Sequence, residues 1–239
     1  MESSKLVYKR ILLKLSGEAL QGQGAFGIDS VAASEIAMAI KTLTQMGVEV
    51  GIVLGGGNLL RGATLAQSGF DRVTCDHAGM MATVINGLMV RDALLNVGLT
   101  AHLLSSLAIQ GTVETYDRSK AVYYLNQGRV VVFAGGTGNP FFSTDSAASL
   151  RAIEIGADVL LKATKVDGVY SADPMIDKDA EFFKTLSYDE VIKRQLKVMD
   201  MTAFSLCRDH AMPIRVFNMY QPGILKEIIL GADLGTLVN

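Results

Sequence analysis

Short runs of apolar and β-branched residues alternate along this chain with longer segments in which apolar positions recur every three to four residues. Runs of the first kind are typical of buried strands, and segments of the second kind are typical of amphipathic helices. Strands are predicted at 10–15, 48–54, 100–105, 129–134, 157–162 and 214–218. Helices are predicted at 30–46, 76–97, 117–127, 145–155, 188–194, 202–210 and 223–230. The alternation predicts βαβ units and therefore an α/β fold with a largely parallel central sheet.

Turn-forming residues interrupt this alternation between residues 164 and 184, where Val166-Asp167-Gly168 is followed by Asp173-Pro174. The 239 residues are enough for one large domain or for two lobes around a shared sheet. With 4 prolines and no low-complexity tract, no flexible linker is predicted. We therefore expect one domain over residues 1–239 whose parts are tightly joined.

The charge balance disfavours polyanion binding. Lysine and arginine number 22 and aspartate and glutamate 24, so the net charge is -2, and we expect neither a nucleic acid nor a membrane partner. Cys75 and Cys207 form no CxxC pair, and no secretory leader is recognised, which favours a cytoplasmic protein. The apolar stretch 152–161 contains Glu154 and Asp158 and is too short to span a membrane, so no membrane segment is predicted.

Two predicted strands end in small residues. Lys14-Leu15-Ser16-Gly17 closes the strand at 10–15, and Gly55-Gly56-Gly57 directly follows the strand at 48–54. Strand ends of this kind present backbone N–H groups to phosphate. A lysine in the first loop and Arg61 beyond the second add positive charge. Two such loops predict two phosphorylated ligands that face each other.

Two other glycine patterns do not predict the sites that they match. Residues 22–27 fit G-x-G-x-x-G, but they lie beyond the first strand and the next helix begins only near residue 30. A dinucleotide site needs strand, loop and helix to be contiguous, so a mobile glycine-rich loop is favoured there. Residues 57–62 have Walker spacing, yet the chain contains no Gly-Lys pair, which excludes a P-loop NTPase.

Further motifs are spread along nearly the whole chain, at 9–20, 55–58, 61–62, 76–77, 135–145, 161–170, 173–174 and 197–200. Together they resemble the amino acid kinase superfamily and, within it, the bacterial UMP kinases. The segment 138–145, with the sequence GNPFFSTD, is similar to the UMP kinase subgroup rather than to the aspartate, glutamate or carbamate kinases. The resemblance implies a three-layer αβα sandwich, with an acceptor part over residues 1–160 and an ATP-binding part over residues 161–239.

The resemblance also implies phosphoryl transfer from Mg-ATP to UMP, which gives UDP and ADP. A phosphate monoester has a second pKa of about 6, so the attacking oxygen of UMP is already ionised at pH 7 and needs no general base. Catalysis then consists of positioning and of neutralising charge on the transferred group. Lysines, glycine N–H groups and Mg²⁺ supply this, with Mg²⁺ held mainly by the ATP phosphates rather than by a protein metal site.

Site residues follow from the same resemblance. The predicted catalytic residues are Lys14, Arg61, Asp145 and Lys162. The predicted ATP-binding residues are Lys14, Leu15, Ser16, Gly17, Gly57, Arg61, Thr164, Tyr170 and Asp173. The predicted UMP-binding residues are Gly56, Arg61, Asp76, Thr137, Gly138, Asn139, Pro140, Phe141, Phe142, Ser143 and Thr144.

Several of these residues also have a structural interpretation. Lys14 could be a strand-end lysine in solvent, and Tyr170 an ordinary half-buried tyrosine. Asp76 and Asp145 each lie at a predicted helix start, where capping is the alternative. The resemblance instead implies that Asp76 accepts hydrogen bonds from the ribose hydroxyls. It implies that Asp145 orients the catalytic lysine.

Regulation and assembly are implied by the resemblance alone: a homohexamer, inhibited by UTP and activated by GTP. The region linked to GTP comprises Gly22, Gln23, Gly24, Ala25, Phe26 and Gly27. Glycines permit such a segment to order and disorder.

Two rival functions are weighed. A molybdate or tungstate storage protein shares the resemblance, but His77, His102 and His210 have no metal-ligand spacing. A sister kinase for an amino acid or carbamate is disfavoured by residues 137–145.

Overall fold

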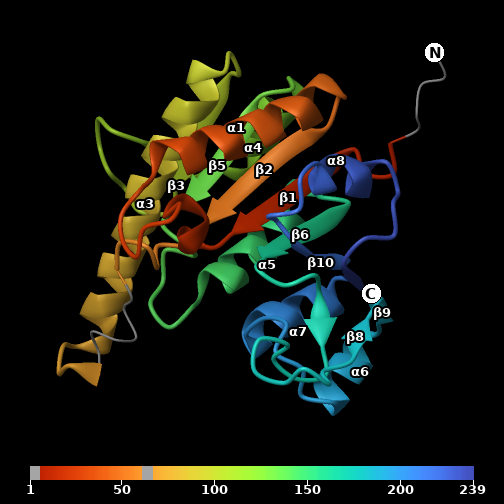
Figure 1. Ribbon diagram of the computed structural model, residues 1–239. Coiled ribbons are helices and arrows are strands. Elements are labelled where there is room, and N and C mark those ends of the chain that lie inside the picture. Colours follow the sequence, from red (N-terminus) through yellow and green to blue (C-terminus); the bar gives the residue numbers. More distant parts are fainter. Residues whose placement is uncertain (1–5, 61–66) are drawn as a thin grey trace, which may run out of the picture.

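A nine-stranded sheet forms the centre of the computed structural model, which describes residues 6–60 and 67–239 (Figure 1). Its strands lie in the order β4 (Glu114–Thr115), β3 (Ala101–Ser105), β5 (Val130–Ala134), β2 (Glu49–Leu54), β1 (Arg10–Leu15), β6 (Val159–Thr164), β10 (Ile214–Asn218), β11 (Thr236–Val238) and β9 (Thr185–Leu186). Neighbouring strands in this sheet are parallel except for β10 and β11. The predicted largely parallel sheet is therefore confirmed.

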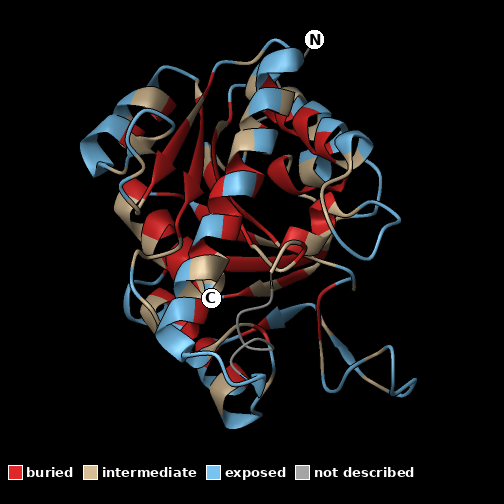
Figure 2. Ribbon diagram, turned by 90° about the vertical axis from the view of Figure 1, so that its left-hand side faces the viewer, coloured by how far each residue is buried: buried red, intermediate tan, exposed pale blue. Residues whose placement is uncertain are grey.

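Helices cover both faces of the sheet (Figures 1 and 2). One face carries α1 (Ser30–Gln45), α3 (Arg72–Asn96) and α8 (Ile224–Ile229); the other carries α4 (Arg118–Asn126), α5 (Thr144–Ile155), α6 (Tyr188–Lys193) and α7 (Met201–Asp209). Side chains alternate along each strand, so in β1 Ile11 and Leu13 pack into the core under α1 while Leu12 packs into the core under α5. The predicted three-layer αβα sandwich is confirmed.

Two predicted elements have bounds that differ from the structure by two residues or more. α3 begins at Arg72, because Asp71 caps it by accepting a hydrogen bond from the backbone N–H of Thr74 at 2.9 Å. Asp76 therefore lies inside the helix, and the capping interpretation of Asp76 is wrong. β6 begins at Val159 rather than near residue 157, since Gly156 ends α5 in the left-handed conformation with φ 65°.

Short elements lie in the predicted break between residues 164 and 184, and one lies directly after β1. β7 (Val169–Tyr170) and β8 (Phe182–Phe183) form a separate antiparallel pair, and η1 (Gly17–Leu20) is a single 3₁₀ turn. β7 is held to the main sheet because the backbone N–H of Val169 donates to the buried Thr236 hydroxyl at 2.8 Å. The sequence pattern misses these elements, because two to four residues are too few to express a period.

In the described part of the chain, α3 is the helix long and apolar enough, by length and composition, to cross a membrane. Its most apolar window is 44% buried, and the helix packs against α1, β3 and β5. Met81, Ile85 and Met89 recur every fourth residue and are exposed on its outer face. The rest of its apolar character is explained by packing against the sheet.

Candidate active site

The two glycine loops lie side by side at the carboxyl ends of β1 and β2. The strands pair in register up to Leu15 and Leu54, and the backbone N–H of Gly55 donates to the carbonyl of Leu15 at 2.9 Å. A Cβ on Gly17 would lie 2.8 Å from the backbone nitrogen of Gly57, so only glycine permits this approach. The two loops therefore meet at one edge of the sheet.

Three charged side chains meet beneath these loops. Asp145 stands in the first turn of α5, where its Oδ1 lies 2.8 Å from the Nζ of Lys14 and its Oδ2 accepts a hydrogen bond from the Nζ of Lys162 at 2.6 Å. The Lys162 ammonium also donates to the carbonyl of Val198 at 2.5 Å. Ser143, rather than Asp145, caps α5, because its hydroxyl accepts from the backbone N–H groups of Asp145 and Ser146. The capping interpretation of Asp145 is therefore wrong.

The electrostatics of this cluster favour an anionic ligand. Burial raises the pKa of Asp145, but the positive charges of Lys14 and Lys162 outweigh burial and hold that pKa below its ordinary value of 3.8. Burial lowers the pKa of Lys162, Asp145 raises it and Lys14 lowers it, with a net result below the ordinary 10.5. Two lysines thus share one ionised carboxylate, and although the charge of Asp200 also raises the pKa of Lys162, the three-residue cluster itself keeps one excess positive charge.

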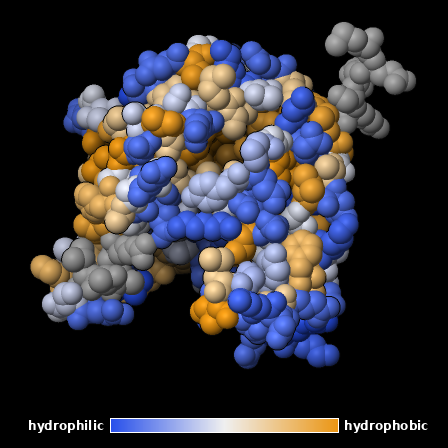
Figure 3. All heavy atoms as spheres, viewed as in Figure 1, coloured by the Kyte–Doolittle hydropathy of each residue, from blue (hydrophilic) through white to orange (hydrophobic). Residues whose placement is uncertain are grey.

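A pocket of about 470 Å³ opens between the amino-terminal ends of α3 and α7. Figure 3 shows the surface deeply notched between these two parts of the molecule. The pocket is lined by Gly56, Gly57, Leu60, Arg72, Cys75, Asp76, Gly79, Met80, Thr83, Gly136, Phe141, Phe142, Ser143, Thr144, Asp200, Met201 and Thr202. Six predicted UMP-binding residues, Gly56, Asp76, Phe141, Phe142, Ser143 and Thr144, are among them. The structure brings together most of the acceptor residues that the sequence predicted.

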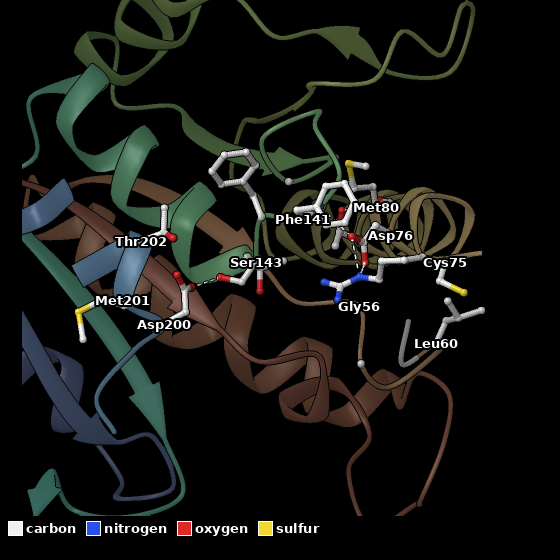
Figure 4. Close-up of a pocket in the computed structure, with 17 residues that line it drawn as sticks. Gly56, Leu60, Cys75, Asp76, Met80, Phe141, Ser143, Asp200, Met201 and Thr202 are labelled. Atoms are coloured by element: carbon white, nitrogen blue, oxygen red, sulfur yellow. Dashed lines mark hydrogen bonds and ion pairs between the residues drawn. The ribbon is translucent and has the colours of Figure 1, made fainter. Parts of the chain in front are cut away.

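Asp76 joins α3 to the segment that follows β5 (Figure 4). Its Oδ2 accepts a hydrogen bond from the backbone N–H of Phe141 at 2.8 Å, and its Oδ1 accepts one from the Nε of Arg72 at 2.9 Å. The Arg72 guanidinium lies 5.6 Å from the centre of the Phe141 ring. Phe141 has φ 70°, an uncommon backbone conformation that Asp76 helps to hold. Predicted residues Thr137, Gly138, Asn139 and Pro140 form a turn outside the pocket lining.

Asp200 links the start of α7 to the start of α5. It caps α7 by accepting from the backbone N–H of Ala203 at 3.0 Å, and it also accepts from the hydroxyls of Ser143 and Ser146. In Figure 4 the Asp200 and Ser143 side chains point toward each other across one end of the pocket. The carboxylate of Asp200 is fully engaged by these contacts.

Some lining residues were missed by sequence reasoning. Arg72 could have been found, because it stands four residues before Asp76 in a helix, the spacing of a side-chain ion pair. Met80, Thr83, Gly136, Met201 and Thr202 carry no such signal, since only the fold brings these three segments to one pocket.

The predicted ATP-binding residues outside the glycine loops lie beyond the pocket, near the carboxyl end of β6 and in the β7–β8 hairpin. The Thr164 hydroxyl donates to the carbonyl of Val166 at 2.7 Å, and the Tyr170 ring meets the edge of Phe182 with 5.3 Å between centroids. Asp173 is exposed, and its carboxylate accepts from the backbone N–H of Met175. Arg61, predicted for both ligands, lies outside the described residues.

Comparison with known proteins decides the family. A profile of the amino acid kinase family matches residues 9–218. This chain belongs to the amino acid kinase family. It is 57% identical over 236 residues to uridylate kinase from Photorhabdus laumondii, covering 99% of this chain and 98% of that protein. It is 59% identical to uridylate kinase from Actinobacillus succinogenes, covering 99% of this chain and all of that protein (100%).

The fold gives the same result for this amino acid kinase family member. The crystal structure of UMP kinase from Bacillus anthracis superposes with a TM-score of 0.94 at 40% identity, over 97% of this chain and 96% of that one. The predicted resemblance to the UMP kinase group of the family is therefore confirmed.

Proposed function

We propose that this protein transfers the terminal phosphoryl group of Mg-ATP to UMP and releases UDP and ADP. One observation carries the proposal: a largely buried cluster of Lys14, Asp145 and Lys162 lies beneath two adjoining glycine loops, in a chain closely similar to uridylate kinases. One loop suits each phosphorylated ligand, and the cluster supplies positive charge where they meet. Such an arrangement stabilises charge in transfer and requires no general base.

Lys14 contacts the transferred group in this proposal, and Asp145 orients it. The ion pair between Lys14 Nζ and Asp145 Oδ1 at 2.8 Å fixes the end of a side chain that is otherwise flexible. Lys162 holds the other carboxylate oxygen and contributes a second charge. The backbone N–H groups of Gly17 and Gly57, with Leu15 and Ser16, receive the ATP phosphates.

The acceptor lies in the pocket at the start of α3. Asp76 accepts hydrogen bonds from the ribose hydroxyls, and Phe141 and Phe142 form an apolar wall for the base; their exposed fractions are 68% and 51%. Gly56 approaches the acceptor phosphate with its backbone, and Arg61 contributes a guanidinium that takes two phosphate oxygens at once. The residues from Thr137 to Thr144 surround the nucleoside.

The adenosine of ATP is bound by Thr164, Tyr170 and Asp173. The acceptor part then covers residues 1–160 and the ATP-binding part residues 161–239, the division that we propose for this single domain. Asp145 and Asp200 are already engaged by lysines, hydroxyls and a backbone N–H, and no cluster of three possible ligand side chains is found among residues 6–60 and 67–239. We therefore propose that Mg²⁺ arrives on the ATP phosphates, where it neutralises their charge.

Regulation completes the proposal. GTP activates through the glycine-rich segment 22–27, and UTP inhibits. Support comes from a reciprocal contact beside the phosphate loop, since the backbone N–H of Gly27 donates to Asn58 O at 3.1 Å and the Asn58 amide donates back to Gly27 O at 2.9 Å. A Gly24→Ala variant, with a stiffer segment, is expected to lose the GTP response; a full response in that variant contradicts the proposed route.

The assembly that we propose is a homohexamer in the cytoplasm. The exposed methionines and isoleucine on α3 offer an apolar face for contact between subunits. Sedimentation equilibrium measures the mass directly: six times 25.6 kDa is expected, and a monomer at assay concentration contradicts the proposal.

The first experiment is ADP release by the purified protein with Mg-ATP and each of UMP, CMP, AMP, aspartate, acetylglutamate and carbamate. Turnover with UMP that disappears in a Lys14→Met variant is expected, and GTP and UTP are then added in turn. Turnover with an amino acid or carbamate instead indicates a sister kinase. No turnover with any acceptor, together with bound molybdenum or tungsten in a metal analysis, indicates a storage protein.

A further inference from the structure

We propose that the buried side-chain amides of Asn58 and Asn86 fix the position of the second glycine loop against the first, and so set the distance across which the phosphoryl group is transferred. Asn58 follows the loop Gly55-Gly56-Gly57, and Asn86 lies in the middle of α3. This inference makes both asparagines positioning residues and rests on the proposed kinase function.

The two amides use all of their N–H groups on each other and on the backbone. Asn58 Nδ2 donates to Gly27 O at 2.9 Å and to Asn86 Oδ1 at 3.0 Å. Asn86 Nδ2 donates to Gly55 O and to Asn58 Oδ1, both at 2.7 Å. Their exposed fractions are 1% and 0%. A buried polar pair satisfied in this way has one favoured geometry, because any shift leaves a donor or acceptor without a partner.

The pair contacts both glycine loops. Asn58 Oδ1 lies 2.5 Å from the point where a Cβ on Gly17 would be, so the Asn58 side chain packs directly against the first loop. Gly55 O, held by Asn86, belongs to the second loop, and a Cβ on Gly56 would lie 2.8 Å from Gly79 O in α3. The two amides thus clamp both loops to one rigid helix.

That helix also carries the acceptor side of the pocket. Asp76 stands on α3 ten positions before Asn86, two to three turns along a continuous helix. Asp76, which we propose binds the nucleoside, and Asn86, which holds the second glycine loop, are therefore on the same rigid helix. Displacement of reacting groups by about 1 Å can reduce a rate by about 100-fold, so a clamp of this kind bears on the chemical step more than on either binding step.

The pair contributes to stability as well as to position. Two apolar side chains at these sites would leave the carbonyls of Gly55 and Gly27 without the amide donors that they have here. Two apolar residues would also form no directional contacts, whereas the amides hold Gly55 O and Gly27 O at defined positions by hydrogen bonds. The asparagines therefore specify where the loop lies.

The test compares Asn86→Leu with Asn96→Leu. Asn96 is on the same helix but is exposed, and its amide donates to the Asp92 carboxylate at 3.1 Å. For Asn86→Leu we expect kcat for UMP to fall at least about tenfold, while the Kd of ATP alone and of UMP alone, measured by calorimetry, stays within about threefold of the parent value. Asn96→Leu is expected to keep the parent kcat.

Other results for the folded variant contradict the proposed role of the asparagine pair. A folded Asn86→Leu enzyme with parent kcat, or one in which affinity for both nucleotides falls while kcat is unchanged, means that the pair is merely structural. If Asn86→Leu does not fold, Asn86→Ser, which keeps one donor, is held to the same criterion. Turnover by the parent and by Asn96→Leu reports the proposed function separately, because an active parent with no difference between the two variants refutes the clamp alone.

Discussion

Lys14 and Lys162 occupy the same register position on the neighbouring parallel strands β1 and β6, and their ammonium groups reach opposite oxygens of one carboxylate, Asp145. Leu12 and Leu160, two residues earlier in each strand, pack in the core beneath α5, which fixes the face on which both lysines stand. The charge cluster is thus a direct result of strand register. A shift of either strand by one residue would turn its lysine to the other face.

Replacing Asp145 by asparagine keeps the shape and removes the charge that holds both lysines. We expect kcat to fall about 100-fold to 1000-fold, the cost typical of losing a preorganised electrostatic group, because the two ammonium groups then repel each other and leave their positions. Steady-state ADP release measures this change in kcat. Asp158→Asn is the matched control, since Asp158 is exposed and accepts from the backbone of Lys9 and Arg10 at the opposite edge of the sheet. A folded Asp145→Asn enzyme with parent kcat removes this residue from the catalytic set.

The Asp145 carboxylate also makes the free energy of unfolding depend on pH in the acid range. Because the pKa of Asp145 is lowered in the folded protein, the unfolded state binds more protons at pH values near and below 3.8. The stabilisation from Asp145 is therefore fully present above its unfolded pKa and is lost as the pH falls through the lower, folded value. Urea unfolding between about pH 6 and pH 3, which covers the plateau and the beginning of this loss, should show the free-energy gap between parent and Asp145→Asn shrinking toward acid. A gap that widens toward acid contradicts the assignment.

Two glycines in the phosphate loops should respond differently to alanine. Among the described residues a Cβ on Gly57 meets nothing within 4 Å, whereas a Cβ on Gly17 would lie 2.5 Å from Asn58 Oδ1 and 2.8 Å from Gly57 N. Gly57→Ala is therefore expected to keep Tm within about 2 °C, and Gly17→Ala to lower it by about 5 °C or more. Because we propose that phosphate fills the space at Gly57, the KM for ATP in Gly57→Ala should rise about tenfold. A Gly57→Ala enzyme with the parent KM means that no ligand approaches there.

How much the sequence could predict depends on how far apart along the chain the interacting residues lie. The long strands and helices follow from local periodicity, and the meeting of the two glycine loops follows from their position at the ends of strands that proved to be neighbours. The chemical role assigned to Lys14 depended on resemblance, since position alone favoured a solvent lysine, whereas the structure buries it to 8% exposure. The amides of Asn58 and Asn86 meet across 28 residues of chain, a distance that no local pattern encodes.

Asp76 offers the sharpest test of the acceptor side. Its carboxylate accepts from the backbone N–H of Phe141 and from Arg72, and an asparagine keeps one oxygen for the backbone contact but loses the charge. A hydrogen bond to a charged group contributes about 1.5–3 kcal/mol, so Asp76→Asn should raise the KM for UMP about tenfold or more while kcat changes less than about threefold. Asp71→Asn is the control, because asparagine still caps α3 and position 71 is exposed outside the pocket lining. If kcat falls instead and calorimetry finds unchanged UMP binding, Asp76 acts on the chemical step rather than as the nucleoside anchor.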